Sequence, residues 1–133
     1  MVEEAYVSFE TAKLLKEKGF NESCYQKYDN EGYLSFNHVG YINNEKSCDD
    51  FCALAPTQQM AMRWLREEYK LAINIRIACK KTISYVFDIW DFEIIHPNKF
   101  VGGTIDLREQ QFDFKSYEQA AEAAIKYCLE NLI

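Results

Sequence analysis

Apolar and polar positions alternate along this chain with two different periods, and the helical period is clearest towards the C-terminus. A helix is predicted over residues 117–131, and the apolar positions in it and directly after it share one broad arc: Tyr117, Ala120, Ala121, Ala124, Ile125, Cys128 and Leu132. The opposite side carries charge: Glu118, Glu122, Lys126 and Glu130. Ser116 precedes this arc as an N-cap, and Gln119 stands where a capping box places its second member. The pattern predicts an amphipathic C-terminal helix with a solvated polar side.

Two more segments have helical patterns. Residues 9–18 follow Ser8, a good N-cap, and end before Gly19 and Phe20, which resemble a glycine C-cap with its hydrophobic contact. A helix over residues 57–70 begins after Pro56. Its apolar side comprises Met60, Ala61, Trp64, Leu65 and Leu71, with Arg63, Arg66 and Lys70 opposite.

Strand patterns fill much of the sequence between the second and last helices. Ile73, Ile75 and Ile77 alternate with less apolar residues, which is typical of a half-buried strand. Residues 83–95 predict a second strand, in which the apolar phase changes near Ile89 and suggests a β-bulge there. A third strand is expected over residues 104–114, with Phe112 and Phe114 facing inward.

The region before the second helix has weaker patterns. Residues 24–28 and 33–36 predict a loose hairpin around Asp29-Asn30-Glu31-Gly32, and residues 41–52 predict a mobile loop. The order of elements predicts an α+β fold: an antiparallel sheet of about three to five strands, with three helices mostly on one face. The length of 133 residues suits a single domain spanning 1–133.

Sequence composition also indicates the cellular compartment. The start of the sequence lacks the pattern of a signal peptide, and no apolar run is long enough for a membrane span, so we expect a cytoplasmic protein without a membrane partner. Five cysteines, an odd number, fit reduced thiols better than a disulfide framework: Cys24, Cys48, Cys52, Cys79 and Cys128. The net charge of −6 argues against a surface built throughout for nucleic acid.

Candidate catalytic and metal chemistry is weak in this sequence. Cys48 and Cys52 with His38 offer three zinc-type ligands, and Cys24 would have to be the fourth, but the spacing matches structural zinc sites poorly. His96 fits a turn residue before proline. We therefore expect no metal, no cofactor and no catalytic residue, while a small enzyme whose site assembles only in three dimensions stays an alternative.

Two segments are candidates for binding. The first is a basic stretch, +4 over residues 63–81, that contains Arg63, Arg66, Lys70, Arg76, Lys80 and Lys81. It suits a phosphate, a nucleic acid or an acidic partner protein, or else a solvated helix face. The second is a tyrosine-rich segment with Tyr25, Tyr28, Tyr33, Phe36 and Tyr41, which suits a binding patch or ordinary packing.

Three segments carry a resemblance that covers most of the chain: residues 6–20 (YVSFETAKLLKEKGF), 55–67 (APTQQMAMRWLRE) and 116–124 (SYEQAAEAA). They resemble a family of small uncharacterised proteins from phages and prophages of gut Bacteroidales. The resemblance implies a phage accessory protein expressed in the cytoplasm of a bacterial host. It implies no activity and no catalytic residue.

These observations favour a non-enzymatic accessory protein that binds a host protein or a small anionic ligand, with counter-defence as one such role. The alternative is a nucleic-acid-associated factor that uses the basic stretch with nearby aromatics. Aromatic residues and an antiparallel sheet edge are also compatible with a homodimer.

Overall fold

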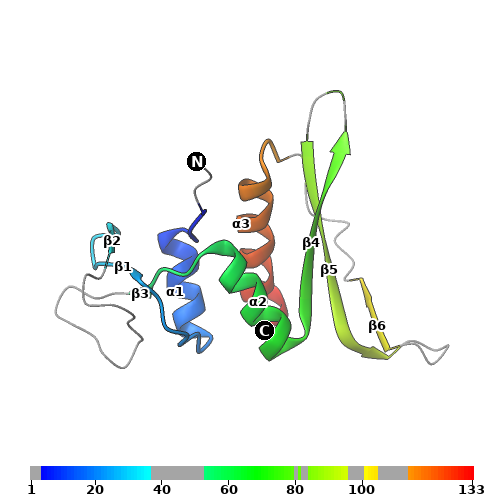
Figure 1. Ribbon diagram of the computed structural model, residues 1–133. Helices are drawn as coiled ribbons and strands as arrows, with labels where there is room; N and C mark the ends of the chain where they lie inside the picture. Colours follow the sequence, from blue (N-terminus) through cyan, green and yellow to red (C-terminus); the bar gives the residue numbers. More distant parts are fainter. Residues whose placement is uncertain (1–3, 37–52, 80, 82–83, 96–100, 105–113) are drawn as a thin grey trace.

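The computed structural model describes residues 4–36, 53–79, 81, 84–95, 101–104 and 114–133 (Figure 1). Three α-helices, α1 (Phe9–Glu17), α2 (Gln58–Tyr69) and α3 (Tyr117–Tyr127), combine with antiparallel strands, and a π-helical turn η1 (Cys128–Leu132) continues α3. This confirms the α+β class and the three predicted helices, whose observed bounds agree closely with the predicted ones. The loop predicted over residues 41–52 lies outside the described residues.

Side-chain caps explain where the helices begin. The hydroxyls of Ser8, Thr57 and Ser116 each accept a hydrogen bond from the backbone N–H three residues later, at 3.1–3.2 Å. Gln119 Oε1 accepts from the N–H of Lys115 at 3.1 Å, so the predicted capping box forms with the residue before Ser116. These caps satisfy N–H groups that have no partner within the helix.

The strands form two antiparallel sheets rather than one. The larger has the order β4-β5-β6, from β4 (Leu71–Cys79), β5 (Ser84–Ile95) and β6 (Val101–Thr104). The smaller has the order β2-β1-β3, from β1 (Gln26–Tyr28), β2 (Leu34–Phe36) and β3 (Ala53–Leu54). In the predicted hairpin turn, Asp29 Oδ1 accepts the N–H groups of Glu31 and Tyr33 at 2.9 and 3.0 Å, and Gly32 supplies a φ of 88°.

The predicted β-bulge near Ile89 is wrong. Pairing between β4 and β5 runs without a shift from Leu71 opposite Asp91 to Ile77 opposite Tyr85, with Ile73 opposite Ile89. The phase change has another cause: Ile89 is fully buried on the helix side, whereas its neighbour Trp90 is 43% exposed on the opposite face. Both faces of β5 carry apolar residues, and this changes the phase without a bulge at Ile89. The register of β5 shifts further along, in its pairing with β6 between Asp91 and Ile95.

Most of the strand predicted over residues 104–114 lies outside the described residues. β6 ends at Thr104, where the predicted strand would begin, and residues 105–113, including Phe112, lie outside the described part of the chain. Phe114 exchanges two backbone hydrogen bonds with Tyr85, at 2.8 and 3.1 Å. Its ring also lies 5.9 Å from that of Phe87, so Phe114 extends the outer edge of β5 and packs against the core.

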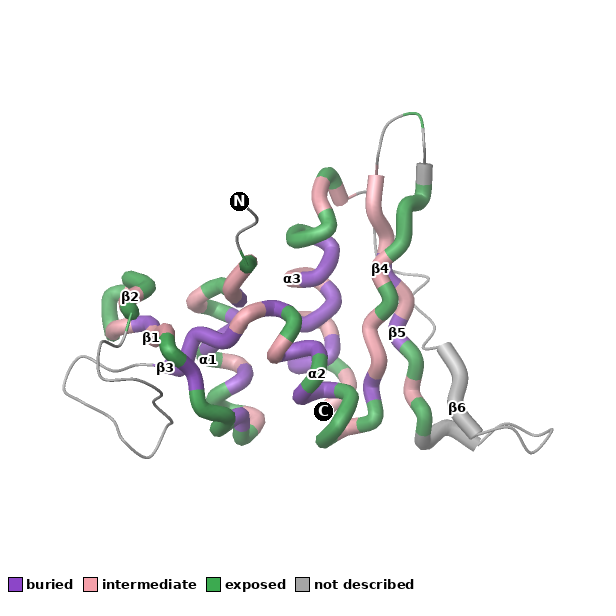
Figure 2. The backbone as a smooth tube through the Cα atoms, viewed as in Figure 1, coloured by how far each residue is buried: buried purple, intermediate pink, exposed green. Residues whose placement is uncertain are grey.

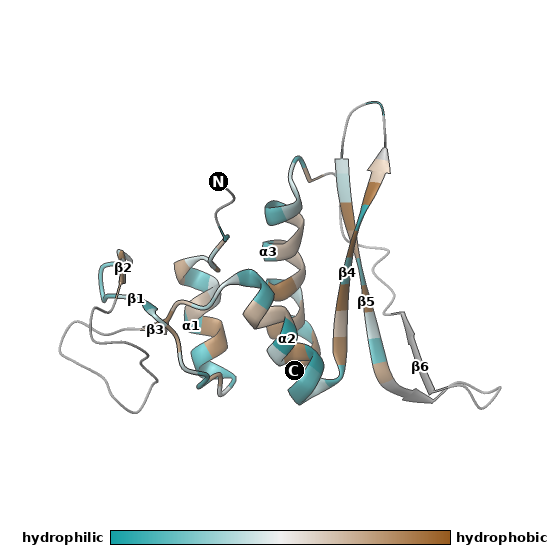
Figure 3. Ribbon diagram, in the orientation of Figure 1, coloured by the Kyte–Doolittle hydropathy of each residue, from teal (hydrophilic) through white to brown (hydrophobic). Residues whose placement is uncertain are grey.

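The core lies between the helices and one face of the β4–β5 hairpin (Figure 1). α2 and α3 contact this hairpin, and α1 contacts α3 and β3. Figures 2 and 3 show buried stretches in α2 and α3 and apolar residues on α3 and β4. The largest fully buried apolar side chains come from every layer: Leu15, Phe20, Leu54, Leu65, Ile89, Ile125 and Leu129.

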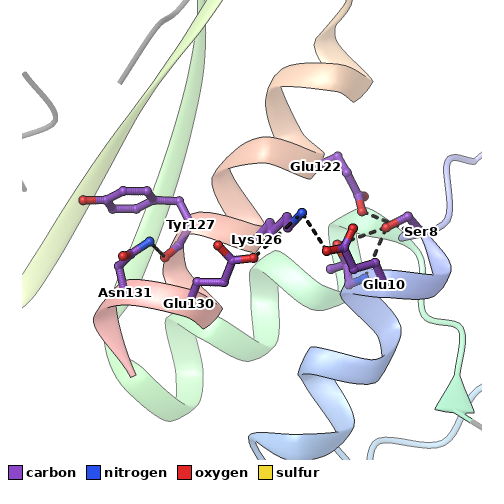
Figure 4. A network of polar contacts seen from close by, with 8 residues as sticks. Ser8, Glu10, Glu122, Lys126, Tyr127, Glu130 and Asn131 are labelled. Atoms are coloured by element: carbon purple, nitrogen blue, oxygen red, sulfur yellow. Dashed lines mark hydrogen bonds and ion pairs between the residues drawn. The ribbon is translucent and has the colours of Figure 1, made fainter. Parts of the chain in front are cut away.

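The sequence predicted that the polar side of α3 faces only solvent, but part of this side contacts α1. Glu122 Oε1 accepts the N–H of Ser8 at 2.9 Å, and Lys126 Nζ lies 3.0 Å from Glu10 Oε1 (Figure 4). Both contacts join α3 to the first turn of α1 and the cap before it. α3 therefore packs on two sides, against the sheet through apolar residues and against α1 partly through polar ones.

Candidate functional site

The side chain of Met60 separates two hollows on the surface at the start of α2. One, of about 440 Å³, is lined by Glu22, Ser23, Met60, Arg63, Trp64 and Glu67. The other, of about 320 Å³, reaches from Met60 to the aromatic residues Tyr6, Tyr25 and Phe36. We call Met60, Arg63, Trp64, Tyr25 and Phe36, with the two hollows between them, the Met60 surface.

Local sequence fixes the position of Met60. The N–H of Met60 donates to the Thr57 cap, which places the residue in the first turn of α2. The half-buried thioether then lies 3.8 Å from Cys24 Sγ, just before β1. Burial, with a smaller effect of the Glu22 charge, raises the pKa of Cys24 to about 12. The thiol therefore stays protonated and acts as packing for Met60 rather than as a nucleophile.

An exposed aromatic pair borders the second hollow. The rings of Tyr25 and Phe36 are nearly parallel, at 5° with centroids 5.8 Å apart, and they are 40% and 53% exposed as residues. On the other side of Met60, Trp64 is buried and packs edge-on against Phe20 and Tyr69. Firmly held aromatic side chains supply a large contact area at small entropic cost.

The charges of the Met60 surface are mixed rather than basic. Arg63 Nε lies 2.9 Å from Glu67 Oε1, and both side chains are well exposed. The hydrogen bond from Arg63, then the charge of Arg63, lowers the pKa of Glu67, while the same bond and the charge of Glu67 raise the pKa of Arg63. Glu22 lines the same hollow as this pair. One arginine thus stands among two carboxylates there, which leaves no local excess of positive charge.

The basic stretch divides among different surfaces. Arg63 and Arg66 are exposed on α2, where Lys70 ends the helix and its Nζ donates to the backbone oxygen of Glu67. Arg76 is in β4 and pairs with Asp88 at 3.0 Å. Lys81 lies beyond β4, about 35 Å along an extended strand from Lys70. Lys80 is outside the described residues.

The tyrosines of the tyrosine-rich segment also have different surroundings. Tyr28 is buried, and its hydroxyl donates to the backbone oxygen of Val7 at 2.6 Å, so it belongs to the core. Tyr33, just before β2, is 68% exposed and is not among the residues that line the two hollows. Tyr41 lies outside the described residues. Of the predicted binding residues, the structure brings Tyr25 and Arg63 to the two sides of Met60.

Among the described residues, no three acidic, histidine or cysteine side chains are placed to hold a metal ion. His38, Cys48, Cys52 and His96 are not among those residues, so the zinc and histidine hypotheses are not addressed by them. Within the same ranges, no helix is both long and apolar enough to cross a membrane. Asp88 and Asp91 lie on opposite faces of β5, because pairing there has no bulge.

Sequence reasoning missed the position of Met60 between the two hollows. The helical projection assigned it to the apolar arc of α2 and hence to the core, but its position at the edge of that arc leaves it half-buried. Glu22 was missed because its contact with the hollow depends on a turn between α1 and β1. No family model matches the chain, and the comparisons found neither a curated protein nor a solved structure similar to it.

Proposed function

We propose that this chain is a phage or prophage accessory protein that acts by binding a host protein through the Met60 surface. The proposal rests on one observation. Tyr25 and Arg63, which come from two separate segments, line the two hollows on either side of Met60. Aromatic residues, methionine and arginine are the residue types enriched in protein–protein interfaces. The phage context comes from the resemblance of the sequence, and counter-defence is one role that such binding would serve.

The local charges favour a protein partner over a small anion or a nucleic acid. Arg63 is already paired with Glu67 and shares its hollow with Glu22, so an added phosphate would meet two carboxylates. A protein segment can instead match mixed charge while its apolar side chains contact Met60 and the Tyr25–Phe36 pair. Methionine adapts its shape to such contacts because its side chain is flexible and polarizable.

Site-specific crosslinking in host cells tests this proposal. A photoreactive phenylalanine analogue would replace Tyr25 or Phe36 in the full chain, and Lys13, exposed on α1 and outside both hollows, would serve as the control position. We expect one host protein to crosslink from positions 25 and 36 and not from position 13. Equal crosslinking from all three positions, or none from 25 and 36, would contradict the assignment.

A charge variant adds a second readout. Arg63→Glu reverses the one cation of the Met60 surface without touching the core, and should reduce the crosslinked fraction about tenfold if the partner presents a carboxylate there. Arg76→Glu, in β4, is the matched control, because Arg76 is also an exposed arginine with one carboxylate partner. Equal losses from both variants would indicate a general charge effect and contradict the local one.

A further inference from the structure

A groove runs beside the N-terminal segment, where α1, α2 and α3 begin or meet. Its volume is about 600 Å³, within the roughly 300–1,000 Å³ typical of ligand sites. Ala5, Tyr6, Phe114 and Ala123 supply apolar walls, and the polar lining includes Gln58, Glu118, Glu122 and Lys126. Tyr6 separates this groove from the Met60 surface, and the two sites share no charged residue.

The carboxylate of Glu122 is held in the groove by neutral donors. Its Oε1 accepts the backbone N–H of Ser8 at 2.9 Å (Figure 4), and its Oε2 accepts Gln58 Nε2 at 3.3 Å. Within the described part of the chain, no lysine or arginine forms an ion pair with it. Lys126, the next cation along α3, also lines the groove and feels the charge of Glu122, but its Nζ is paired with other carboxylates, 3.0 Å from Glu10 and 3.8 Å from Glu130.

The groove is also fixed in shape. Gln58 is only 5% exposed, and besides contacting Glu122 its Nε2 donates to the backbone oxygen of Glu118 at 2.9 Å. This amide thus positions the carboxylate and ties the start of α2 to the first turn of α3. A ligand would pay little for ordering such a site, because the side chains are already held in place.

Charge complementarity defines the occupant. The lining holds two carboxylates, half-buried Glu122 and Glu118 one helical turn before it, against one cation, Lys126, whose Nζ is paired with Glu10, so the groove keeps an excess of negative charge between its apolar walls. A lysine or arginine side chain combines the two matching properties, since its aliphatic stem packs on apolar surface while its head carries positive charge. We propose that this groove binds an extended segment of a partner protein, with a lysine or arginine side chain seated against Glu122.

This inference does not depend on the proposed function of the Met60 surface, because it concerns different charged residues. In this proposal the Glu122 carboxylate attracts the cation through its position and charge alone, and no covalent step is involved. The pairing gains strength from the apolar walls, which reduce solvent screening around a charge pair. Specificity for a cation therefore distinguishes this site from a merely apolar groove.

Peptide titration of the isotope-labelled full chain, followed by NMR amide shifts, tests the inference. The probes are three pentapeptides with leucines flanking a central lysine, norleucine or glutamate. We expect the lysine peptide to shift the amides of Ser8, Gln58 and Ala123 in a saturable way, and the norleucine peptide to bind about tenfold more weakly. Equal affinity for all three peptides, shifts confined to other regions, or no shifts at millimolar concentration would overturn it.

Two variants assign the effect to Glu122. Glu122→Gln keeps an acceptor for Ser8 and should weaken the lysine peptide about tenfold while leaving the norleucine peptide unchanged. Glu68→Gln removes an exposed carboxylate from α2, outside the groove lining, and should leave both affinities unchanged. Equal weakening by both variants would overturn the assignment.

A third variant tests the same groove in case Glu122→Gln fails to fold. Ala123→Leu retains all the charges and fills part of the groove from a helical position that leucine tolerates. If Glu122→Gln does not fold, this variant decides the matter. Loss of lysine-peptide binding in folded Ala123→Leu supports the groove, and retained affinity overturns it.

Discussion

Gln58 Nε2 donates a hydrogen bond to the backbone oxygen of Glu118, 2.9 Å away, and so joins the first turns of α2 and α3. The two residues are 60 positions apart in the sequence. Gln58 is almost fully buried, and its amide also reaches the carboxylate of Glu122. Burial of this amide is tolerated because both contacts replace bonds to water.

Gln58→Met should lower the free energy of unfolding by about 1–3 kcal/mol, because methionine keeps the volume and removes both hydrogen bonds. Urea unfolding measures the change. The control is Gln59→Met, next to it on the exposed side, where Nε2 donates to the Tyr117 hydroxyl at 3.2 Å. That variant should change stability by less than about 0.5 kcal/mol. Similar losses in both variants would contradict a special role for Gln58.

Tyr28→Phe should cost about 1–2 kcal/mol at neutral pH, because it removes the buried hydrogen bond to Val7. Burial, then the charge of Glu122, raises the pKa of Tyr28 above its ordinary value of 10.0. The folded state thus favours the neutral phenol, and this stabilisation is lost as the pH rises from 10 through the folded-state pKa. Unfolding of both proteins over that range should show their stabilities converging. A constant difference would contradict the shift.

Cys24 and Cys128 should resist thiol reagents in the folded protein. Both are buried, and burial is the main reason that the pKa of each thiol is raised to about 12. A variant with serine at Cys48, Cys52 and Cys79 isolates these two thiols. With a chromogenic disulfide at pH 8, it should react at least about a hundredfold more slowly when folded than in denaturant. Fast reaction of the folded protein would contradict the burial of these side chains.

Ile89→Ala and Trp90→Ala should differ sharply although the residues are neighbours in β5. Ile89 is fully buried, so its truncation should cost about 2–5 kcal/mol. Trp90 is 43% exposed on the opposite face, so its truncation should lower the free energy of unfolding by at most about half as much. Urea unfolding of the two variants measures both values. An equal or larger loss for Trp90→Ala would contradict the face assignment.

The helices were predictable because their signals are local. Ser8, Thr57 and Ser116 each precede a helix and cap it within four residues, so sequence alone locates these starts. The strands were harder. β5 has Phe87 and Ile89 on one face and Trp90 and Phe92 on the other, and periodicity cannot tell an apolar open face from a bulge.

The candidate site was predictable only in parts. Tyr25 and Arg63 were both chosen from the sequence, but their meeting at Met60 depends on how β1 lies beside the start of α2. The contact of Glu122 with Ser8 spans 114 positions, and a helical projection shows only that Glu122 is polar. Long-range pairing of this kind has no local signal.

The joint between α2 and β4 consists of one residue, Lys70, which takes the left-handed φ of 58° between Tyr69 and Leu71. The N–H of Phe92 donates to its backbone oxygen at 3.0 Å and fixes the joint to β5. One inserted residue would move the side chains of Leu71 and Ile73 to the other face of the sheet. Insertions and deletions should therefore be absent here throughout evolution, so that any homologous chain keeps this spacing whatever its loops become.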